Sequence, residues 1–360
     1  MTSTLAYLIA PAVICLAPLE LDPLLAEVAL RAPALRVQDE AVSAARARVG
    51  VEGAWEDPTA SAMVESVPLA KGPGEPMPMF TYRLTQPLNV FGRRRLAKEA
   101  AAARLGMEEV RRRRVEWHAK AQAAGAFFEL WMNGEMRALL GRQIATISRM
   151  RDSARSRYAA GLPMAHHELL RSEAEIASMQ AEQSALESER LAMASMLNAL
   201  RGRPGDAPVG EPALPARTAL PKLAELLPLA ELRPEVQEAR KMTAEMAAKQ
   251  ELALRMYLPM PMLSVFYEHR PDMPDSAGGE LGLTLPLWWF DRQSREVEMA
   301  GAMLRQAERE VEAMAAMTDA ELRMAHSRAV ASDLALAARE GAARPRFKET
   351  VTSSEAAYMS

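Results

Sequence analysis

This 360-residue sequence predicts a mainly α-helical fold with a β-barrel portion, made of internally duplicated long coiled-coil helices and two β-hairpins. Three observations lead to this prediction. The chain is rich in Ala, Glu, Arg, Leu and Met and has only 5% aromatic residues, a composition typical of long helices. Long segments without proline carry apolar residues at seven-residue steps, and shorter segments alternate apolar with polar residues as strands do.

The residues that form corners recur about 200 positions apart, a period longer than that of solenoid repeats. Pro33 corresponds to Pro234, and Pro58 corresponds to Pro259. Further pairs are Pro87 with Pro286 and Tyr158 with Tyr358. This spacing indicates that one structural unit was duplicated. The second copy stops just after Tyr358, so we expect it to lack the counterpart of the first copy's last helix.

An apolar run, Leu5–Leu19, opens the chain. It has the length of a signal-peptide core and is too short to span a bilayer as a helix. We therefore interpret residues 1–21 as a leader segment, residues 22–215 as the first repeat and residues 216–360 as the second. The chain's one cysteine, Cys15, is expected to be an ordinary apolar residue of the leader, with lipid attachment as the alternative.

Helices are predicted on both sides of the first hairpin. One is expected to begin with the cap Asp22-Pro23 and to run toward Gly50, with a break at Pro33. Another extends from about Arg94 to Ala160, where proline is absent. Heptad steps pass through Val110, Trp117, Ala124 and Trp131, and later through Met179, Leu186, Met193 and Leu200. We expect Gly161-Leu162-Pro163 to turn the chain between these two coiled-coil helices.

Each repeat is predicted to contribute one β-hairpin, at about residues 58–90 and 259–289. Four strands leave open edges, so closing a barrel requires further strands from self-association. The strand residues expected to face lipid are Tyr82, Leu84, Leu281, Leu283, Leu285 and Leu287. Trp288, Trp289 and Phe290 follow them and are expected to form an aromatic girdle at the membrane interface.

Several segments, in this order, resemble the TolC-type outer-membrane efflux proteins, in particular the outer-membrane component of heavy-metal and related tripartite pumps of the RND type. They are Leu30–Leu35, Gln86–Arg95, Arg157–Leu162, Leu197–Pro204 and Leu283–Leu287. The resemblance implies a homotrimeric α/β-barrel channel. In that family each protomer gives four strands to a twelve-stranded barrel in outer-membrane lipid, and long helices form a tunnel through the periplasm.

The resemblance also implies a function and partners. The chain would be the exit duct of a tripartite efflux system, exporting small solutes or metal ions received from a periplasmic adaptor and an inner-membrane pump. The helical tip that meets the adaptor and closes the tunnel would comprise Arg157, Tyr158, Gly161 and Leu162. Two alternatives remain open: the outer-membrane component of type I protein secretion, and a coiled-coil scaffold that forms no channel.

Other functions lack a supporting pattern. We expect no enzymatic activity and no cofactor, because no nucleophile elbow, phosphate loop or dinucleotide fingerprint occurs. We expect no metal site, because His166-His167-Glu168 lacks the second histidine that the zincin pattern needs, and the methionine pairs lack a defined coordination set. The arginines at 93–95 and 111–114 are interspersed along the helix with Glu99, Glu108, Glu109 and Glu116, and the net charge is −3, so nucleic-acid binding is not predicted.

Overall fold

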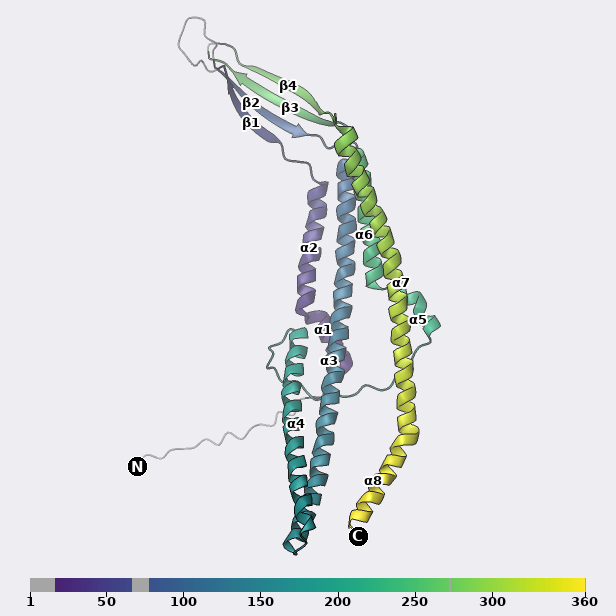
Figure 1. Cartoon of the computed structure of the whole chain (residues 1–360). Coiled ribbons are helices and arrows are strands. Elements are labelled where there is room, and N and C mark those ends of the chain that lie inside the picture. Colours follow the sequence, from purple (N-terminus) through teal and green to yellow (C-terminus); the bar gives the residue numbers. More distant parts are fainter. Residues whose placement is uncertain (1–16, 67–77, 272, 360) are drawn as a thin grey trace, which may run out of the picture. The chain divides into compact units, whose positions relative to one another are not determined.

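The computed structural model describes residues 17–66, 78–271 and 273–359 (Figure 1). The predicted leader through residue 16, with Cys15, and the loop at 67–77 lie outside the described residues. The helices and strands are α1 (Leu21–Arg31), α2 (Pro33–Gly53), β1 (Thr59–Glu65), β2 (Met79–Pro87), α3 (Arg93–Ala159), α4 (Met164–Leu200), α5 (Leu223–Ala230), α6 (Pro234–Arg255), β3 (Met260–His269), β4 (Ser276–Thr284), α7 (Ser294–Ala338) and α8 (Arg344–Met359). Two π-helical turns, η1 (Trp289–Gln293) and η2 (Arg339–Ala343), flank α7.

The chain divides into two compact units. One, called here the tip unit, contains Met1–Asp39 and Arg114–Thr218. The other, the sheet unit, contains Glu40–Arg113 and Ala219–Ser360. Helix α3 contributes residues to both. These units are groups of residues in contact with one another. They do not test the repeat boundaries predicted from the sequence, which stay a prediction.

Proline and glycine set the helix boundaries. Ala32 adopts ψ 128°, because a residue before proline avoids the helical region, and α2 then begins at Pro33. Pro234 begins α6 in the same way. The expected cap at Asp22 is displaced by two residues: α1 begins at Leu21 with Glu20 as its N-cap, so Asp22 lies in the first turn. Among the described residues, no helix is both long enough and apolar enough to cross a membrane.

The core of the tip unit packs α1 against α3 and α4. Phe127 of α3 is completely buried, as are Val28 of α1 and Leu197 of α4. Alanines 119, 123 and 126 fill the remaining positions and let the helices approach closely. The buried residues of α3 in this core, at 119, 123, 126 and 127, lie on one face of the helix.

The heptad predicted on α3 agrees only in part with the observed burial. Val110 is buried and Trp131 is partly buried, but Trp117 is 68% exposed. Near Trp117 the small residues Ala119 and Ala123 of the neighbouring face are buried instead, because alanines allow the helices to pack more closely than a tryptophan would. On α4 the predicted heptad agrees better, because Met179, Leu186 and Met193 are partly buried and Leu197 is fully buried.

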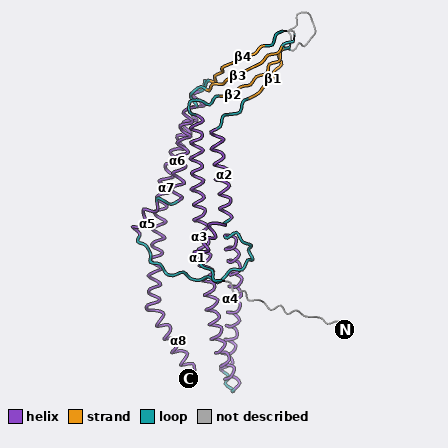
Figure 2. Tube along the Cα trace, turned by 180° about the vertical axis from the view of Figure 1, so that it is seen from behind, coloured by secondary structure: helices purple, strands orange, loops and turns teal. Residues whose placement is uncertain are grey.

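The sheet unit contains a four-stranded antiparallel sheet in the order β1-β2-β3-β4 (Figure 2). Both predicted hairpins are present, and β2 pairs with β3 to join them. Pro87 ends β2, and Pro286 follows the end of β4, because proline has no N–H for the ladder. The helices α2, α3, α6 and α7 all connect to the same end of the sheet, as both views of the chain show.

A largely buried ion pair joins α1 to the residues that directly follow α4. Glu27 of α1 accepts hydrogen bonds from Arg201 Nε at 2.9 Å and from Arg203 Nε at 2.7 Å. Only 16% of the Glu27 side chain and 8% of the Arg201 side chain are exposed. Burial raises the pKa of Glu27, but the hydrogen bonds and charges of the two arginines outweigh it, so the pKa lies below its ordinary value.

We predict that Glu27→Gln destabilises the protein by about 3 kcal/mol at neutral pH, because two arginines then lose their buried counter-charge. The folded pKa of Glu27 is lowered, so the ion pair contributes stability above the unfolded pKa, near 4.5, and loses it as the pH falls through the folded pKa. Unfolding of the full chain by denaturant, measured at about pH 7 and about pH 3.5, should show the difference shrinking in acid.

Glu173→Gln is the control for this change. Glu173 pairs with Arg155 at 3.1 Å in the same unit, but both side chains are exposed, so its loss should cost less than about 1 kcal/mol. Equal destabilisation by the two variants, or a Glu27→Gln effect that does not change with pH, would contradict the assigned role of Glu27.

Candidate functional site

The sheet has one apolar face. The register places Tyr82 opposite Tyr267 and Leu84 opposite Val265, and Leu263 lies opposite Leu281. The large exposed apolar residues of this face are Val64, Tyr82, Leu84, Leu263, Val265, Tyr267, Leu281 and Leu283. The four predicted lipid-facing residues that lie within strands are thus on one face, and side chains of this kind are costly to leave in water.

The opposite face is more polar, although Met63, Met262 and Phe266 also lie on it. Arg83 of β2 forms an ion pair with Glu280 of β4, across the intervening strand β3. Thr85 and Ser264 hydroxyls are 2.9 Å apart and hydrogen-bonded. The Arg83 guanidinium also lies 5.6 Å from the centre of the Phe266 ring. Charged and hydroxyl groups that satisfy one another suit a surface that faces water rather than lipid.

The last two predicted lipid-facing leucines lie outside the sheet. Strand β4 ends at Thr284, so Leu285 and Leu287 belong to the segment that leads into η1. The N–H of Leu287 donates to the carbonyl of Leu285 at 2.9 Å, across Pro286. The predicted strand is therefore wrong beyond Thr284, because proline at 286 interrupts the ladder and a tight turn replaces it. Both leucines remain exposed.

Exposed aromatic residues gather at the end of the sheet that joins the helices. This aromatic belt consists of Trp55, Phe91, Trp288, Trp289 and Phe290, all exposed. Trp288 and Trp289 both contact Phe290 edge-on, with ring centres 6.2 and 6.0 Å apart. Sequence reasoning found the last three and missed Trp55 and Phe91. Trp55 and Phe91 lie immediately outside the first hairpin, as Trp288 lies just outside the second. This correspondence could have predicted them as members of the aromatic belt.

The helical tip of the tip unit is a tight turn between α3 and α4. Gly161 adopts φ +87°, a conformation that other residues rarely adopt, which explains glycine here. The N–H of Gly161 donates to Tyr158 at 3.0 Å, and that of Leu162 donates to Arg157 at 3.3 Å. The predicted tip residues are therefore brought together in one turn, and Tyr158 and Leu162 are exposed at it.

The adjacent His166-His167-Glu168 segment takes part in the tip's own contacts. The His166 ring lies 4.8 Å from the Tyr158 ring, and Arg157 Nη2 donates to Glu168 at 2.8 Å. The two interactions tie α4 to the end of α3. Within the described part of the chain, no group of three or more potential metal-binding side chains is found.

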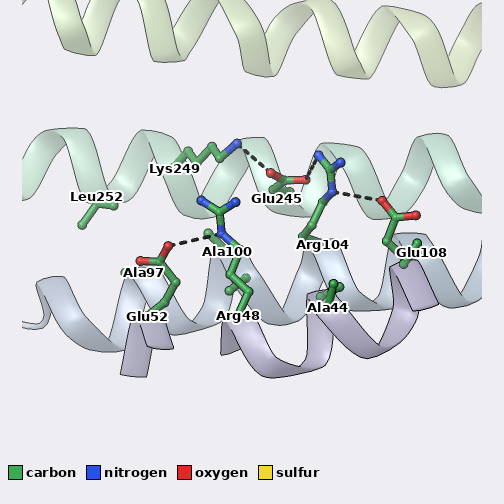
Figure 3. Close-up of a pocket in the computed structure, with 13 residues that line it drawn as sticks. Ala44, Arg48, Glu52, Ala97, Ala100, Arg104, Glu108, Glu245, Lys249 and Leu252 are labelled. Atoms are coloured by element: carbon green, nitrogen blue, oxygen red, sulfur yellow. Dashed lines mark hydrogen bonds and ion pairs between the residues drawn. The ribbon is translucent and has the colours of Figure 1, made fainter. Parts of the chain in front are cut away.

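The helices of the sheet unit enclose a groove of about 480 Å³ lined by alanines of α2 and α3 (Figure 3). Charged side chains cross it in pairs. Arg104 Nε lies 3.2 Å from Glu108, its Nη1 lies 4.0 Å from Glu245, and Lys249 lies 2.6 Å from the same glutamate. Glu108 and Glu245 are almost fully buried, so these contacts hold α3 and α6 together.

Arg104, Glu245 and Lys249 were not singled out from the sequence. The spacing of four residues between Arg104 and Glu108, and between Glu245 and Lys249, was the signal for pairing along each helix. The pairing of Arg104 with Glu245 between helices depends on the fold. Positive and negative groups balance around the groove, which therefore strengthens the wall and offers no unmatched charge to a ligand.

The comparisons with known proteins agree with this architecture. The sequence profile of the family described as outer membrane efflux protein matches residues 24–203, half of the chain. A search of curated proteins gives no significant match.

Several solved structures have a similar fold. The Campylobacter jejuni CmeC outer membrane channel is 14% identical, with a TM-score of 0.75 over 92% of this chain and 76% of that one. The open state of the Neisseria gonorrhoeae MtrE outer membrane channel is 20% identical, with a TM-score of 0.69 over 94% and 78%. The Vibrio cholerae outer membrane protein VceC is 18% identical, with a TM-score of 0.65 over 94% and 83%.

The profile match and the shared fold together identify the chain. It belongs to the outer membrane efflux protein family, a family of non-enzymatic transport proteins of the Gram-negative outer membrane that extend into the periplasm.

Proposed function

We propose that three copies of this chain form the exit duct of a tripartite efflux system. The duct would receive small solutes or metal ions from an inner-membrane RND-type pump through a periplasmic adaptor. The observation that carries this proposal is the sheet in the sheet unit: one face is apolar, the other is more polar, and neither outer edge has a strand partner within the described residues.

The open edges support self-association. β1 pairs only with β2 and β4 only with β3 among the described strands, so each leaves a row of backbone N–H and C=O groups unpaired. In lipid these groups have no water to bind, and each one left unsatisfied costs several kcal/mol. Pairing β4 of one copy with β1 of the next satisfies both edges, and three copies of four strands give the twelve-stranded barrel of the family.

The two faces support an assignment of inside and outside. Tyr82, Leu84, Leu281 and Leu283 would face lipid, while Arg83 and Glu280 would line the water-filled lumen. Leu285 and Leu287 would meet lipid just beyond the strand, next to the aromatic belt. A lumen lined by paired charges and hydroxyls binds passing solutes weakly, so the pump and adaptor would determine which cargo is exported.

The helical tip supports the adaptor assignment. Tyr158 and Leu162 are exposed beside the turn, and Arg157 is oriented by Glu168. An exposed aromatic and an exposed aliphatic side chain on a rigid turn provide the apolar anchors typical of protein interfaces. We propose that Arg157, Tyr158, Gly161 and Leu162 form the surface that contacts the adaptor and closes the tunnel.

We predict that Ala62→Glu reduces the amount of trimer in the outer membrane at least about threefold. Ala62 is paired with Tyr82 on the apolar face of β1, so a carboxylate there would face lipid, at a cost of up to about 2 kcal/mol. Outer membranes expressing the full chain are isolated and run on gels unheated and boiled. A trimer-sized band that disappears on boiling measures assembly.

Ser61→Glu is the matched control. Ser61 is the neighbouring exposed residue of the same strand, but it is paired with Arg83 on the polar face. The same new carboxylate should therefore be tolerated. If the wild-type chain gives no heat-sensitive trimer, the duct proposal fails. If Ala62→Glu assembles as well as Ser61→Glu, the assignment of the apolar face to lipid fails.

We predict that Gly161→Ala weakens adaptor binding by about fivefold while the trimer still forms. Space for a Cβ exists at this position, but φ +87° strains any side-chain-bearing residue by about 1 kcal/mol, so the tip would distort. Adaptor affinity is measured by titrating purified trimer with adaptor protein.

Gly141→Ala in α3 provides the comparison, because a Cβ there also meets nothing within 4 Å and the backbone is helical. It should leave adaptor affinity unchanged and stabilise the helix slightly. Equal affinities for the two variants would remove Gly161 from the adaptor surface.

A further inference from the structure

A small amphipathic pocket lies where β4 gives way to η1, within the aromatic belt. Its volume is about 280 Å³. The side chains that matter for its chemistry are Arg93, Leu285, Leu287, Arg292, Gln293 and Glu296. The pocket joins apolar groups on the sheet side to charged and amide groups on the helix side, all within the sheet unit.

The charged lining carries one net positive charge, from two arginines and one glutamate. Arg93 is held in place because its Nη2 donates to the carbonyls of Arg255 at 3.0 Å and Leu258 at 2.5 Å, at the end of α6. Arg292 contacts Glu296 through Nε at 3.3 Å, and 75% of its side chain remains exposed. The N–H groups of Arg93 and Arg292 that are not used in these contacts suit a phosphate.

Gln293 adds a polar group without a partner. Its side-chain oxygen Oε1 is buried and has no hydrogen-bond partner among the described residues. A buried acceptor left unsatisfied is unfavourable, so a bound molecule with a hydroxyl or ammonium donor would stabilise this site.

The surroundings indicate what kind of molecule reaches the pocket. Leu285, Leu287 and Trp288 are exposed at its rim, and Trp289 and Phe290 follow directly. Aromatic side chains of this kind concentrate at the level of lipid headgroups. A ligand here would place apolar chains along the leucines and its polar head between the arginines.

We propose that this pocket binds the headgroup of a glycerophospholipid in the leaflet that faces the periplasm. Arg93 and Arg292 hold the phosphate, and Gln293 Oε1 accepts a hydrogen bond from a hydroxyl or ammonium group of the headgroup. The acyl chains lie against Leu285 and Leu287. This proposal rests on the proposed barrel function, because that function brings the pocket to the membrane interface.

The test uses the assembled full chain, extracted from outer membranes, depleted of lipid and examined by native mass spectrometry. The probes are phosphatidylglycerol and dioleoylglycerol, which differ in the phosphate headgroup. We expect the wild type to retain phosphatidylglycerol about tenfold more than dioleoylglycerol, a difference of about 1.4 kcal/mol. Arg292→Glu should abolish this preference.

Arg295→Glu is the matched control. Arg295 is equally exposed, at 76%, and its Nη1 contacts Glu298 at 3.3 Å, but it does not line the pocket. It should retain the lipid as the wild type does. Equal retention by Arg292→Glu and Arg295→Glu overturns the proposal. If Arg292→Glu does not assemble, Gln293→Leu, which changes no charge, is used instead. If the Gln293→Leu variant retains phosphatidylglycerol as the wild type does, the proposal is overturned.

Three further outcomes can be told apart. Displacement of phosphatidylglycerol by millimolar inorganic phosphate would mean a free-anion site and overturn the lipid assignment. Failure of the wild type to give a heat-sensitive trimer would refute the duct itself. Intact trimers that show no preference between the two probes would refute only the lipid site.

Discussion

Backbone pairing at the edges of the four-stranded sheet is the constraint on which the rest of the structure depends. Segments far apart in the sequence, β2 and β3, pair in the centre of the sheet and leave β1 and β4 at its borders. A sheet with an apolar face cannot remain in water, and one with open edges cannot remain in lipid. The proposed closure among several copies would satisfy both requirements and would bring the long helices together around a common axis.

The helical parts meet a different constraint. In the proposed duct the helices would form a tunnel wall with water on both sides, so they could not bury a wide apolar face. In the tip unit, alanines of α3 pack with Phe127 and with leucines of the other helices to form the core, and Glu27 joins α1 to Arg201 and Arg203. In the sheet unit, Glu245 links Arg104 of α3 to Lys249 of its own helix. Partly buried ion pairs thus supply specific contacts where apolar burial is limited.

The aromatic belt marks the change between these two environments. On its sheet side, exposed leucines such as Leu281 and Leu283 continue the apolar face, and on its helix side charged pairs such as Arg292 with Glu296 begin. Proline at 286 ends the strand at this level and a π-helical turn opens the next helix. The pocket at this junction is amphipathic for the same reason: it combines the last apolar side chains of one environment with the first charges of the other.

Local patterns in the sequence determined the elements themselves. Alternating residues around Tyr82 and Leu283 predicted the strands, the absence of proline between Arg94 and Ala160 predicted α3, and Gly161 predicted the turn at its end. These features depend on neighbouring residues, whose backbone preferences act over a few positions. The same reasoning extended β4 to Leu287, because alternation continues there and only the lack of an N–H at Pro286 stops the ladder.

Tertiary structure alone decided which faces and partners were used. The predicted heptad of α3 places Val110 in the core, but at Trp117 the neighbouring face carrying Ala119 and Ala123 is buried instead. The pairings of Glu27 with Arg201 and of Arg104 with Glu245 join residues whose separation in the sequence gives no sign of contact. Sequence periodicity shows which positions share a face, but only the packing of distant segments determines which face becomes buried and which charges meet.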